Sequence, residues 1–361
     1  MGRSKVAVLT TRAATVLEDY ARLMDLAGYQ NFVPPGPDLA LKINISWHYF
    51  YPACSTTPWQ LDGVISKLLA DGYPKDKLYG CHNRTVVVSA KRGEVANKHK
   101  QVVDKHGLRN IHLYEKEEEW IRYEPKAKML ALNEIYPDGI RIPKRLIGSN
   151  ILHLPTMKTH VFTTITGAMK NAFGGLLFEK RHWTHSVIHE TLVDLLAIQK
   201  EIHPGIFAVM DATFAGDGPG PRCMVPHVKD YILASGDMVA IDAVAAKMMG
   251  FDPLSLKFIR LAHEAGLGCG DVREIDIVGE DISNVNFHFN GAADTFASRG
   301  QKLIYWGPLK PLEKFLLRTA IAPWSYAASI LYHDYYWYPF IGRPRVKRAL
   351  ESEWGQLFAR Y

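Results

Sequence analysis

The stretch that decides the fold is NILHLPTMKTHVFTTITGAMKNAFGG, residues 150–175. It begins with a short apolar run, Asn150 to Leu154, which predicts a buried strand ending at Pro155. It then gathers two lysines, a histidine, five threonines and an asparagine, and closes on a Gly-Gly pair. Open α/β sheets bind their ligands where polar groups follow a strand and precede a helix. The stretch therefore predicts an α/β fold with a ligand site at the end of this strand.

Outward from this stretch, strand and helix patterns alternate along most of the chain. Strand patterns occur at 6–9, 41–45, 206–210, 232–235 and 276–279, and helix patterns at 14–26, 59–71, 185–202 and 240–249. This alternation predicts a mainly parallel sheet with helices on both faces. Thr57 is expected to cap one helix, with Pro58 at its first position, and Asp237 to cap another. We expect an α/β domain over residues 1–300 and a C-terminal extension over 301–361.

Lys158, His160 and Lys170 are the strongest candidates for catalysis. Two ammonium groups close together favour a bound carboxylate or phosphate, and each lowers the pKa of the other. A histidine that titrates near neutral pH serves as a general acid or base. The alternative is that both lysines are ordinary surface residues. Substrate contacts are predicted from Lys42, Asn44, Thr56, Thr57, Thr164, Thr166, Asn171 and Asp242.

Two of these predictions rest on burial. Lys42 and Asn44 alternate along a strand and so face one side, and a lysine facing inward needs a partner. Asp242 lies on an apolar helix and also needs a partner, for which Lys158 or Lys170 is the candidate.

A divalent metal site is the second hypothesis. His185 and His189 are four residues apart, which places them on one face of a helix. Asp211, at the end of a predicted strand, and Asp217, in the Gly-Pro-rich loop 216–221, are the candidate further ligands. The alternative is a helix start with an exposed polar face.

Composition excludes several classes of protein. The net charge of +6 is not accompanied by a nucleic-acid-reading motif, so nucleic acid is not an expected partner. No apolar run is long enough to span a membrane, and the first residues do not resemble a secretory signal. The four cysteines form no paired motif, which favours a reduced, cytoplasmic protein without an iron–sulfur cluster of its own.

The C-terminal extension, residues 301–361, is basic and aromatic. It holds nine lysines and arginines against four acids. Such a segment suits a membrane surface, at the inner face if the protein is cytoplasmic. It equally suits packing on the α/β domain or a homodimer contact.

Several motifs together resemble the domain-of-unknown-function family 362. They are Lys42-x-Asn44, Thr56-Thr57-Pro58, Leu154-Pro155-x-x-Lys158-Thr159-His160, Thr166-Gly167-Ala168-x-Lys170-Asn171-x-Phe173-Gly174, Asp211, the loop 216–221, Ser235-x-Asp237-x-Val239-Ala240-x-Asp242 and Gly266-Leu267-Gly268. The resemblance spans roughly residues 40–280 and implies an α/β fold. Many members carry a ferredoxin-type cysteine cluster, which this chain lacks, so the resemblance does not extend a redox role to it.

These observations lead to one main functional hypothesis. We expect an enzyme that acts on a small anionic molecule by proton transfer of isomerase or lyase type, assisted by a metal. One alternative is an oxidoreductase that uses an iron–sulfur cluster or flavin supplied by a partner, with Cys54 or Cys269 involved. Another is a non-catalytic ligand-binding or membrane-docked scaffold protein.

Overall fold

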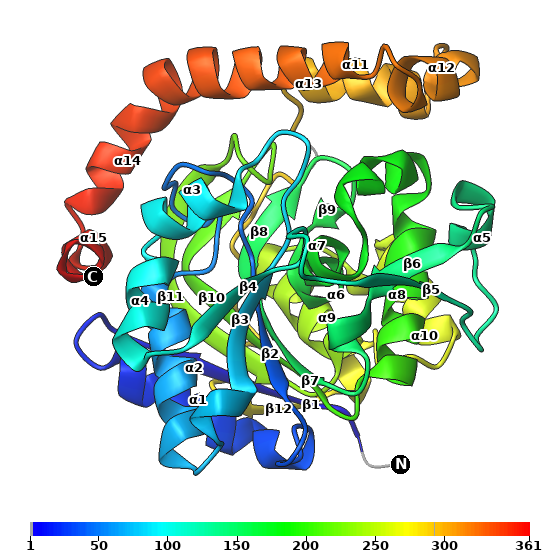
Figure 1. Ribbon diagram of the computed structural model, residues 1–361. Helices are drawn as coiled ribbons and strands as arrows, with labels where there is room; N and C mark the ends of the chain where they lie inside the picture. The colour runs from blue at the N-terminus through cyan, green and yellow to red at the C-terminus, as the bar shows by residue number, and fades with distance from the viewer. Residues whose placement is uncertain (1–2, 292) are drawn as a thin grey trace.

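A computed structural model describes residues 3–291 and 293–361 and shows a twisted sheet covered by helices on both faces (Figure 1). The strand order is β12-β1-β11-β10-β7-β2-β3-β4, with β8 paired to β10 and β9 paired to β8. Six strand pairs are parallel, and only those of β11 with β1 and β10 and of β8 with β9 are antiparallel. The predicted mainly parallel α/β fold is therefore confirmed.

The sheet's strands are β1 (Lys5–Thr10), β2 (Leu39–Ile43), β3 (Leu78–His82), β4 (Arg109–His112), β7 (Asn150–Leu154), β8 (Thr156–His160), β9 (Thr164–Ile165), β10 (Ile206–Asp217), β11 (Val225–Ser235) and β12 (Asp276–Gly279). A separate hairpin consists of β5 (Trp120–Tyr123) and β6 (Ile140–Pro143). Nearly all residues of β2, β3, β7 and β8 are buried, as expected for parallel strands covered on both faces.

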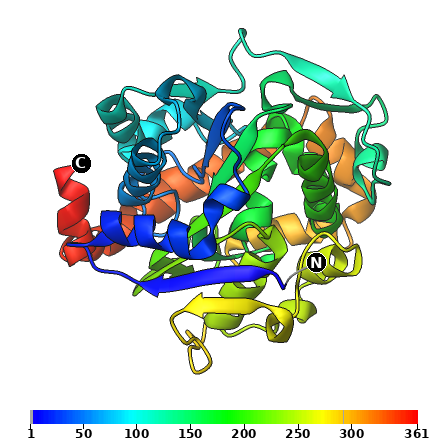
Figure 2. The same ribbon diagram turned by 90° about the horizontal axis from the view of Figure 1, so that it is seen from below.

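Two groups of helices bury the two faces of the sheet (Figure 2). One face is covered by α1 (Val16–Ala27), α2 (Pro58–Ala70) and α4 (His99–His106), and the other by α6 (Gly167–Asn171), α8 (Ile188–Ile202), α9 (Met238–Met249) and α10 (Lys257–Glu264). The shorter helices of the domain are α3 (Ala90–Ala96), α5 (Leu132–Ile135), α7 (Phe173–Leu176) and the 3-10 helix η4 (Glu179–Val187).

The two predicted helix caps are confirmed. Thr57 accepts a hydrogen bond from the Gln60 backbone N–H, Gln60 reciprocates through its side chain, and Pro58 is the first helical residue of α2. Asp237 accepts hydrogen bonds from two backbone N–H groups at the start of α9.

Three predicted element boundaries are wrong. The strand predicted at 232–235 begins at Val225, because β11 pairs with β10 over this longer stretch. The strand predicted at 206–210 continues to Asp217, because β10 pairs with β11 from Ala208 to Asp217 and with β8 at Asp211 and Gly216. Asp211 therefore lies within a strand, and Lys158 and His160 belong to β8 instead of a loop. The helix predicted from His185 begins at Ile188, because the preceding segment is the 3-10 helix η4.

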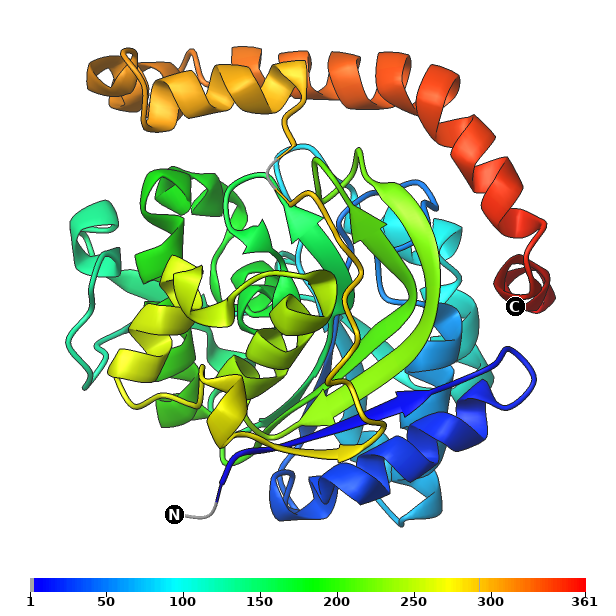
Figure 3. The same ribbon diagram turned by 180° about the vertical axis from the view of Figure 1, so that it is seen from behind.

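The C-terminal helices form a band across the carboxyl ends of the parallel strands (Figures 1 and 3). They are α11 (Phe296–Tyr305), α12 (Glu313–Arg318), α13 (Pro323–Ile330), the π-helix η8 (Leu331–Gly342), α14 (Arg343–Leu350) and α15 (Glu353–Arg360). Hydrogen bonds from Trp47 Nε1 to Asp334 and from Trp354 Nε1 to Asp230, both 2.7 Å, join this band to the sheet domain. The band therefore packs on the domain.

No helix among the described residues has the length and apolar character needed to cross a membrane.

Candidate functional site

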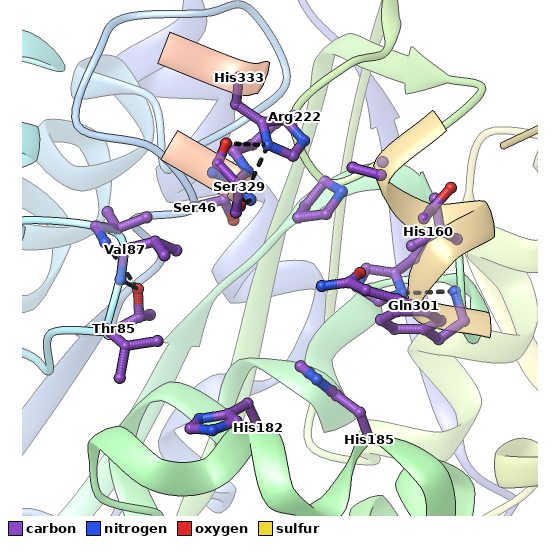
Figure 4. A pocket seen from close by; sticks show the side chains of 18 of the residues that line it. Ser46, Thr85, Val87, His160, His182, His185, Arg222, Gln301, Ser329 and His333 are labelled. Carbon is purple, nitrogen blue, oxygen red and sulfur yellow. Dashed lines mark hydrogen bonds between the residues drawn. The ribbon is translucent and has the colours of Figure 1, made fainter. Parts of the chain in front are cut away.

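A cavity of about 860 Å³ lies between the strand ends and the C-terminal helices (Figure 4). We define the floor of the cavity as the lining residues that come from the sheet domain, between Lys42 and Arg222. Its roof consists of lining residues between Thr295 and His333. The size is within the range of pockets that hold small molecules.

The floor is cationic. Lys42, Lys170, Arg181 and Arg222 all line the cavity, and none of the described lining residues is an aspartate or glutamate. Arg222 donates a hydrogen bond to Ser329 of the roof at 3.2 Å, while its other terminal nitrogen, Nη1, is buried without a hydrogen-bond partner among the described residues. Buried cations are normally paired, so Arg222 favours a bound anion.

Lys170 is the most exceptional of these cations. It is half-buried in the last turn of α6, and within the described part of the chain its ammonium makes no hydrogen bond or ion pair. It lies 5.1 Å from the centre of the Phe173 ring. Burial, with the nearby charges of Lys158 and Arg181, lowers the pKa of Lys170 to about 7.

Lys42 and Lys158 are fully buried lysines with carbonyl partners. Lys42 lines the cavity and donates to the Ile43 carbonyl at 2.6 Å. Lys158 is not among the lining residues, and its ammonium donates to the Cys54 carbonyl at 2.5 Å and to Ser46 Oγ at 3.1 Å. Burial lowers the pKa of each to about 8. Lys158 can therefore affect a ligand in the cavity only through its positive charge and through its hydrogen bond to Ser46, which lines the cavity.

Five histidines line the cavity, namely His82, His160, His182, His185 and His333, and His182 and His185 lie together at one end of it in Figure 4. His160 Nδ1 accepts the Phe162 backbone N–H at 3.1 Å, which leaves the ring proton on Nε2. Nδ1 of His185 lies 3.3 Å from the Tyr305 hydroxyl of the roof. Burial, followed by the charge of Lys170, lowers the pKa of both His160 and His185 well below the ordinary value. Both imidazoles are therefore neutral.

Three predicted polar contacts also lie in the cavity wall. Asn44 and Asn171 hold neighbouring backbone: Asn171 donates to the Lys42 carbonyl at 2.8 Å, and Asn44 to the Cys54 carbonyl at 3.3 Å. The hydroxyl of Thr166 is buried and has no hydrogen-bond partner among the described residues. It is therefore available to a ligand.

Other predicted contacts are structural. Thr56 donates to the Leu154 carbonyl at 2.7 Å, Thr57 caps α2, and Thr164 belongs to the short strand β9. None of the three is among the lining residues.

Asp242 has backbone partners in place of the lysine that we expected. It accepts the N–H groups of Ala168 at 2.5 Å and Met169 at 3.0 Å. Gly167 has a φ of +69° and lies so close to Asp242 that an added Cβ would be 2.3 Å from its carboxyl group. Asp242 therefore fixes the turn that begins α6 and so positions Lys170.

Among the described residues, the ligand atoms of His185, His189, Asp211 and Asp217 do not form a group that could hold a metal ion, so the predicted site is wrong. His185 lies in η4 and His189 in the first turn of α8, so the spacing of four does not place them on one α-helical face. Asp217 is hydrogen-bonded to Asn290 at 2.8 Å. Asp211 accepts hydrogen bonds from Tyr20, Thr57, Trp59 and Thr213.

A different cluster could hold a metal ion. Ligand atoms of His82, Glu94 and His112 lie within 4.8 Å of one another, and no other such group occurs among the described residues. His82 ends β3, His112 ends β4, and Glu94 comes from α3.

Sequence reasoning missed this cluster and part of the cavity wall. His82 and His112 each end a strand at the same edge of the sheet, which is where a ligand site is expected. They lie in a highly charged region, however, where strands are hard to recognise from the sequence. Arg222, Ser329 and His333, which lie side by side in Figure 4, carry no local signal. Only the folded chain brings residue 222 to residues 329 and 333.

The cysteines do not support a redox site. All four are free, and Cys54 donates from its thiol to the Pro221 carbonyl at 3.1 Å. Burial raises the pKa of Cys54 to about 11, and it also raises the pKa of Cys269. Both residues are therefore thiols at neutral pH, and the thiol is a poor nucleophile and metal ligand.

Comparison with known proteins agrees with the resemblance described above. Residues 39–247 match the family described as "Domain of unknown function (DUF362)". The thylakoid-associated protein sll1697 of the cyanobacterium Synechocystis sp. is 26% identical over 136 residues. This alignment covers 36% of the present chain and 41% of the cyanobacterial protein, so the chain spans less than half the length of that relative.

Proposed function

The chain belongs to the DUF362 family, whose description leaves its chemistry open, and from the cavity we propose that this protein is an enzyme acting on an amphipathic anion. The carboxylate or phosphate of this molecule binds the floor, and its apolar part lies under the roof. One observation carries the proposal: Lys170 and Arg222 line the cavity without an ion-pair partner among the described residues, and none of its described lining residues is acidic. The apolar roof residues, which include Ile304, Leu309, Leu317 and Trp324, suit a hydrocarbon chain.

We assign proton transfer to Lys170. With a pKa of about 7 it is populated as both amine and ammonium near neutral pH, which is the condition for general acid–base catalysis. The ammonium gives a proton to the bound molecule at one position, and the resulting amine takes a proton from another position, so the reaction is an isomerisation that needs no external reactant. His160 has its Nδ1 occupied and serves through Nε2–H as a hydrogen-bond donor to the anion.

Binding of a matched set of probes tests this function. Isothermal titration calorimetry compares decanoate with decanol, which lacks the charge, and with acetate, which lacks the chain. We expect decanoate to bind most tightly. Lys170→Met should weaken decanoate binding by about 30-fold or more, since truncating one partner of a buried charge pair costs about 2–5 kcal/mol. Lys180→Met, which removes an exposed lysine outside the cavity wall, is the control.

The stability of Lys170→Met separates binding from folding. Because the ammonium has no partner in the described structure, its removal should leave the melting temperature unchanged or raise it. Equal affinity of decanoate for the wild type and Lys170→Met would contradict the proposal. So would equal affinity for decanoate and decanol.

We further propose that the C-terminal band docks on an anionic membrane, the source of such a substrate. Most large apolar side chains that stay exposed lie between Phe296 and Leu350. We define the outer surface of the band as Leu312, Phe315, Ile321, Tyr335, Tyr336 and Phe340, which are exposed and do not line the cavity. Exposed basic residues accompany them: Lys314, Arg343, Lys347 and Arg348. Apolar and basic groups together are typical of proteins that bind anionic lipid surfaces.

Other observations agree with docking at the cytoplasmic face of a membrane. Free cysteines suit a reducing compartment. The cyanobacterial relative is named for its association with thylakoids.

Vesicle co-sedimentation tests the docking. We expect the protein to sediment with phosphatidylglycerol vesicles, less with phosphatidylcholine vesicles, and less in high salt. The double variant Phe315→Ser/Phe340→Ser should lose most of this binding, whereas Phe32→Ser, an exposed aromatic residue of the sheet domain, should not. Wild-type protein that stays in the supernatant with both lipids would contradict the docking proposal.

A further inference from the structure

The cluster of His82, Glu94 and His112 lies beside the cavity floor at the ends of β3 and β4. Glu94 Oε2 is 3.0 Å from Nε2 of His82 and 3.0 Å from Nε2 of His112. The two imidazole rings stack with their centres 4.8 Å apart. Two imidazoles thus converge on one carboxylate oxygen in the interior of the protein.

Ordinary hydrogen bonding does not account for this arrangement. His82 is 1% exposed, yet neither of its ring nitrogens makes a hydrogen bond within the described structure. Its Nε2 is close to Glu94 but lies outside hydrogen-bonding geometry. The same carboxylate oxygen already accepts hydrogen bonds from His112 and from Asn110 Nδ2 at 2.5 Å. Buried polar side chains are nearly always satisfied, so His82 indicates a missing partner.

We propose that His82, Glu94 and His112 bind a divalent transition-metal ion. Two imidazole nitrogens and one carboxylate oxygen are a recurring ligand set for zinc and iron, with further positions open. Ligands about 2.1 Å from one ion and at right angles to each other are about 3 Å apart, which is the spacing of Glu94 Oε2 from each histidine. Asn110 orients the carboxylate, as outer partners of metal ligands do.

The position of His82 links the ion to the cavity. His82 and the following Asn83 both line the cavity, so an ion bound by the cluster would lie next to it. The ion would polarise a carboxylate or phosphate oxygen of the bound molecule as a Lewis acid. This chemical role rests on the proposed function, whereas binding of the ion does not.

Cobalt(II) binding to the full chain tests the site, because cobalt bound to protein ligands absorbs visible light. After treatment with a chelator and its removal, we expect the protein to bind one equivalent of Co²⁺ with a visible absorption band and a higher melting temperature. Glu94→Gln should weaken Co²⁺ binding by more than about 100-fold, the upper end of the loss for an outer partner. Glu119→Gln, which changes an exposed glutamate, is the matched control.

Two further variants keep the test decisive. If Glu94→Gln does not fold, His82→Asn provides the same comparison at the other side of the cluster. Lys170→Met should bind Co²⁺ as the wild type does, so failure of the anion site does not affect this result. A folded wild type without the visible band, or equal Co²⁺ affinity in Glu94→Gln and Glu119→Gln, would overturn the proposal.

Discussion

The floor and the roof of the cavity differ in the kind of side chain that they carry. The floor comes from the sheet domain and carries Lys42, Lys170, Arg181 and Arg222. The roof comes from helices that follow residue 294 in the chain, and it carries most of the large apolar lining residues. Lys42 lies in β2, Lys170 in α6, Arg181 in η4 and Arg222 in the turn between β10 and β11, whereas the apolar contacts come mainly from the separate layer of C-terminal helices. From this difference we expect a ligand of the cavity to have one charged and one apolar end and to bind in a single orientation.

The sheet domain also contains two kinds of buried ionisable group. Asp211 is enclosed by donors from Tyr20, Thr57, Trp59 and Thr213 at 2.6–3.1 Å. Lys170 has no such partners within the described structure. A satisfied group stabilises the fold, and an unsatisfied one is available to a ligand.

The largest expected effect lies beneath the floor. Asp211→Asn would replace a carboxylate oxygen by an NH₂ group that faces donors, so it should lower the free energy of unfolding by about 3 kcal/mol. Chemical denaturation measures this loss, and Asp138→Asn, at an exposed site, should have no effect. Decanoate affinity of the folded fraction should not change. If Asp211→Asn were as stable as the wild type, the hydrogen bonds of Asp211 would not stabilise the fold. The proposed difference between Asp211 and Lys170 would then be wrong.

The next effect concerns the roof. Each methylene buried against apolar side chains contributes about 0.8 kcal/mol, so decanoate should bind about 15-fold more tightly than octanoate. Calorimetry with the two fatty acids measures the ratio. Equal affinity for the two fatty acids would show that the hydrocarbon chain does not contact the roof. The difference between floor and roof would then have no role in binding.

The smallest effect returns to the floor and depends on pH. The free Lys170 has a pKa of about 7, and a bound anion stabilises its ammonium form. Decanoate affinity should therefore be full below pH 7 and fall as pH rises above 7, by up to about tenfold per pH unit. Decanoate keeps its charge over this range, and in Lys170→Met the fall should begin only near pH 8, where Lys42 and Lys158 lose their protons. The same pH dependence in the wild type and Lys170→Met would place the titrating group elsewhere.

The sequence predicted the fold because alternating strand and helix patterns are local. It also indicated Lys42, His160, Lys170 and Asn171 as cavity residues, because each follows or ends a segment at the ligand-binding edge of a parallel sheet. These assignments needed only the order of elements along the chain.

Other parts depended on long-range pairing and could not be predicted. The prediction that Asp211 ends a strand is wrong, because no local pattern in the sequence shows that β10 continues beside β11 and β8. The pair His185 and His189 was misread because a 3-10 helix and an α-helix have similar local patterns. For the C-terminal extension, residues 301–361, the sequence left contact with a membrane, the sheet domain or a second copy open, and the structure shows that it packs on the sheet domain.

The most direct test of the central claim, that one molecule spans floor and roof, is a crystal structure of the protein with 10-bromodecanoate. We predict the carboxylate at about 3 Å from Lys170 Nζ. The anomalous signal of the bromine should lie beside Ile304 and Leu317 in the roof. A carboxylate outside the cavity, or a bromine at the floor, would contradict the account.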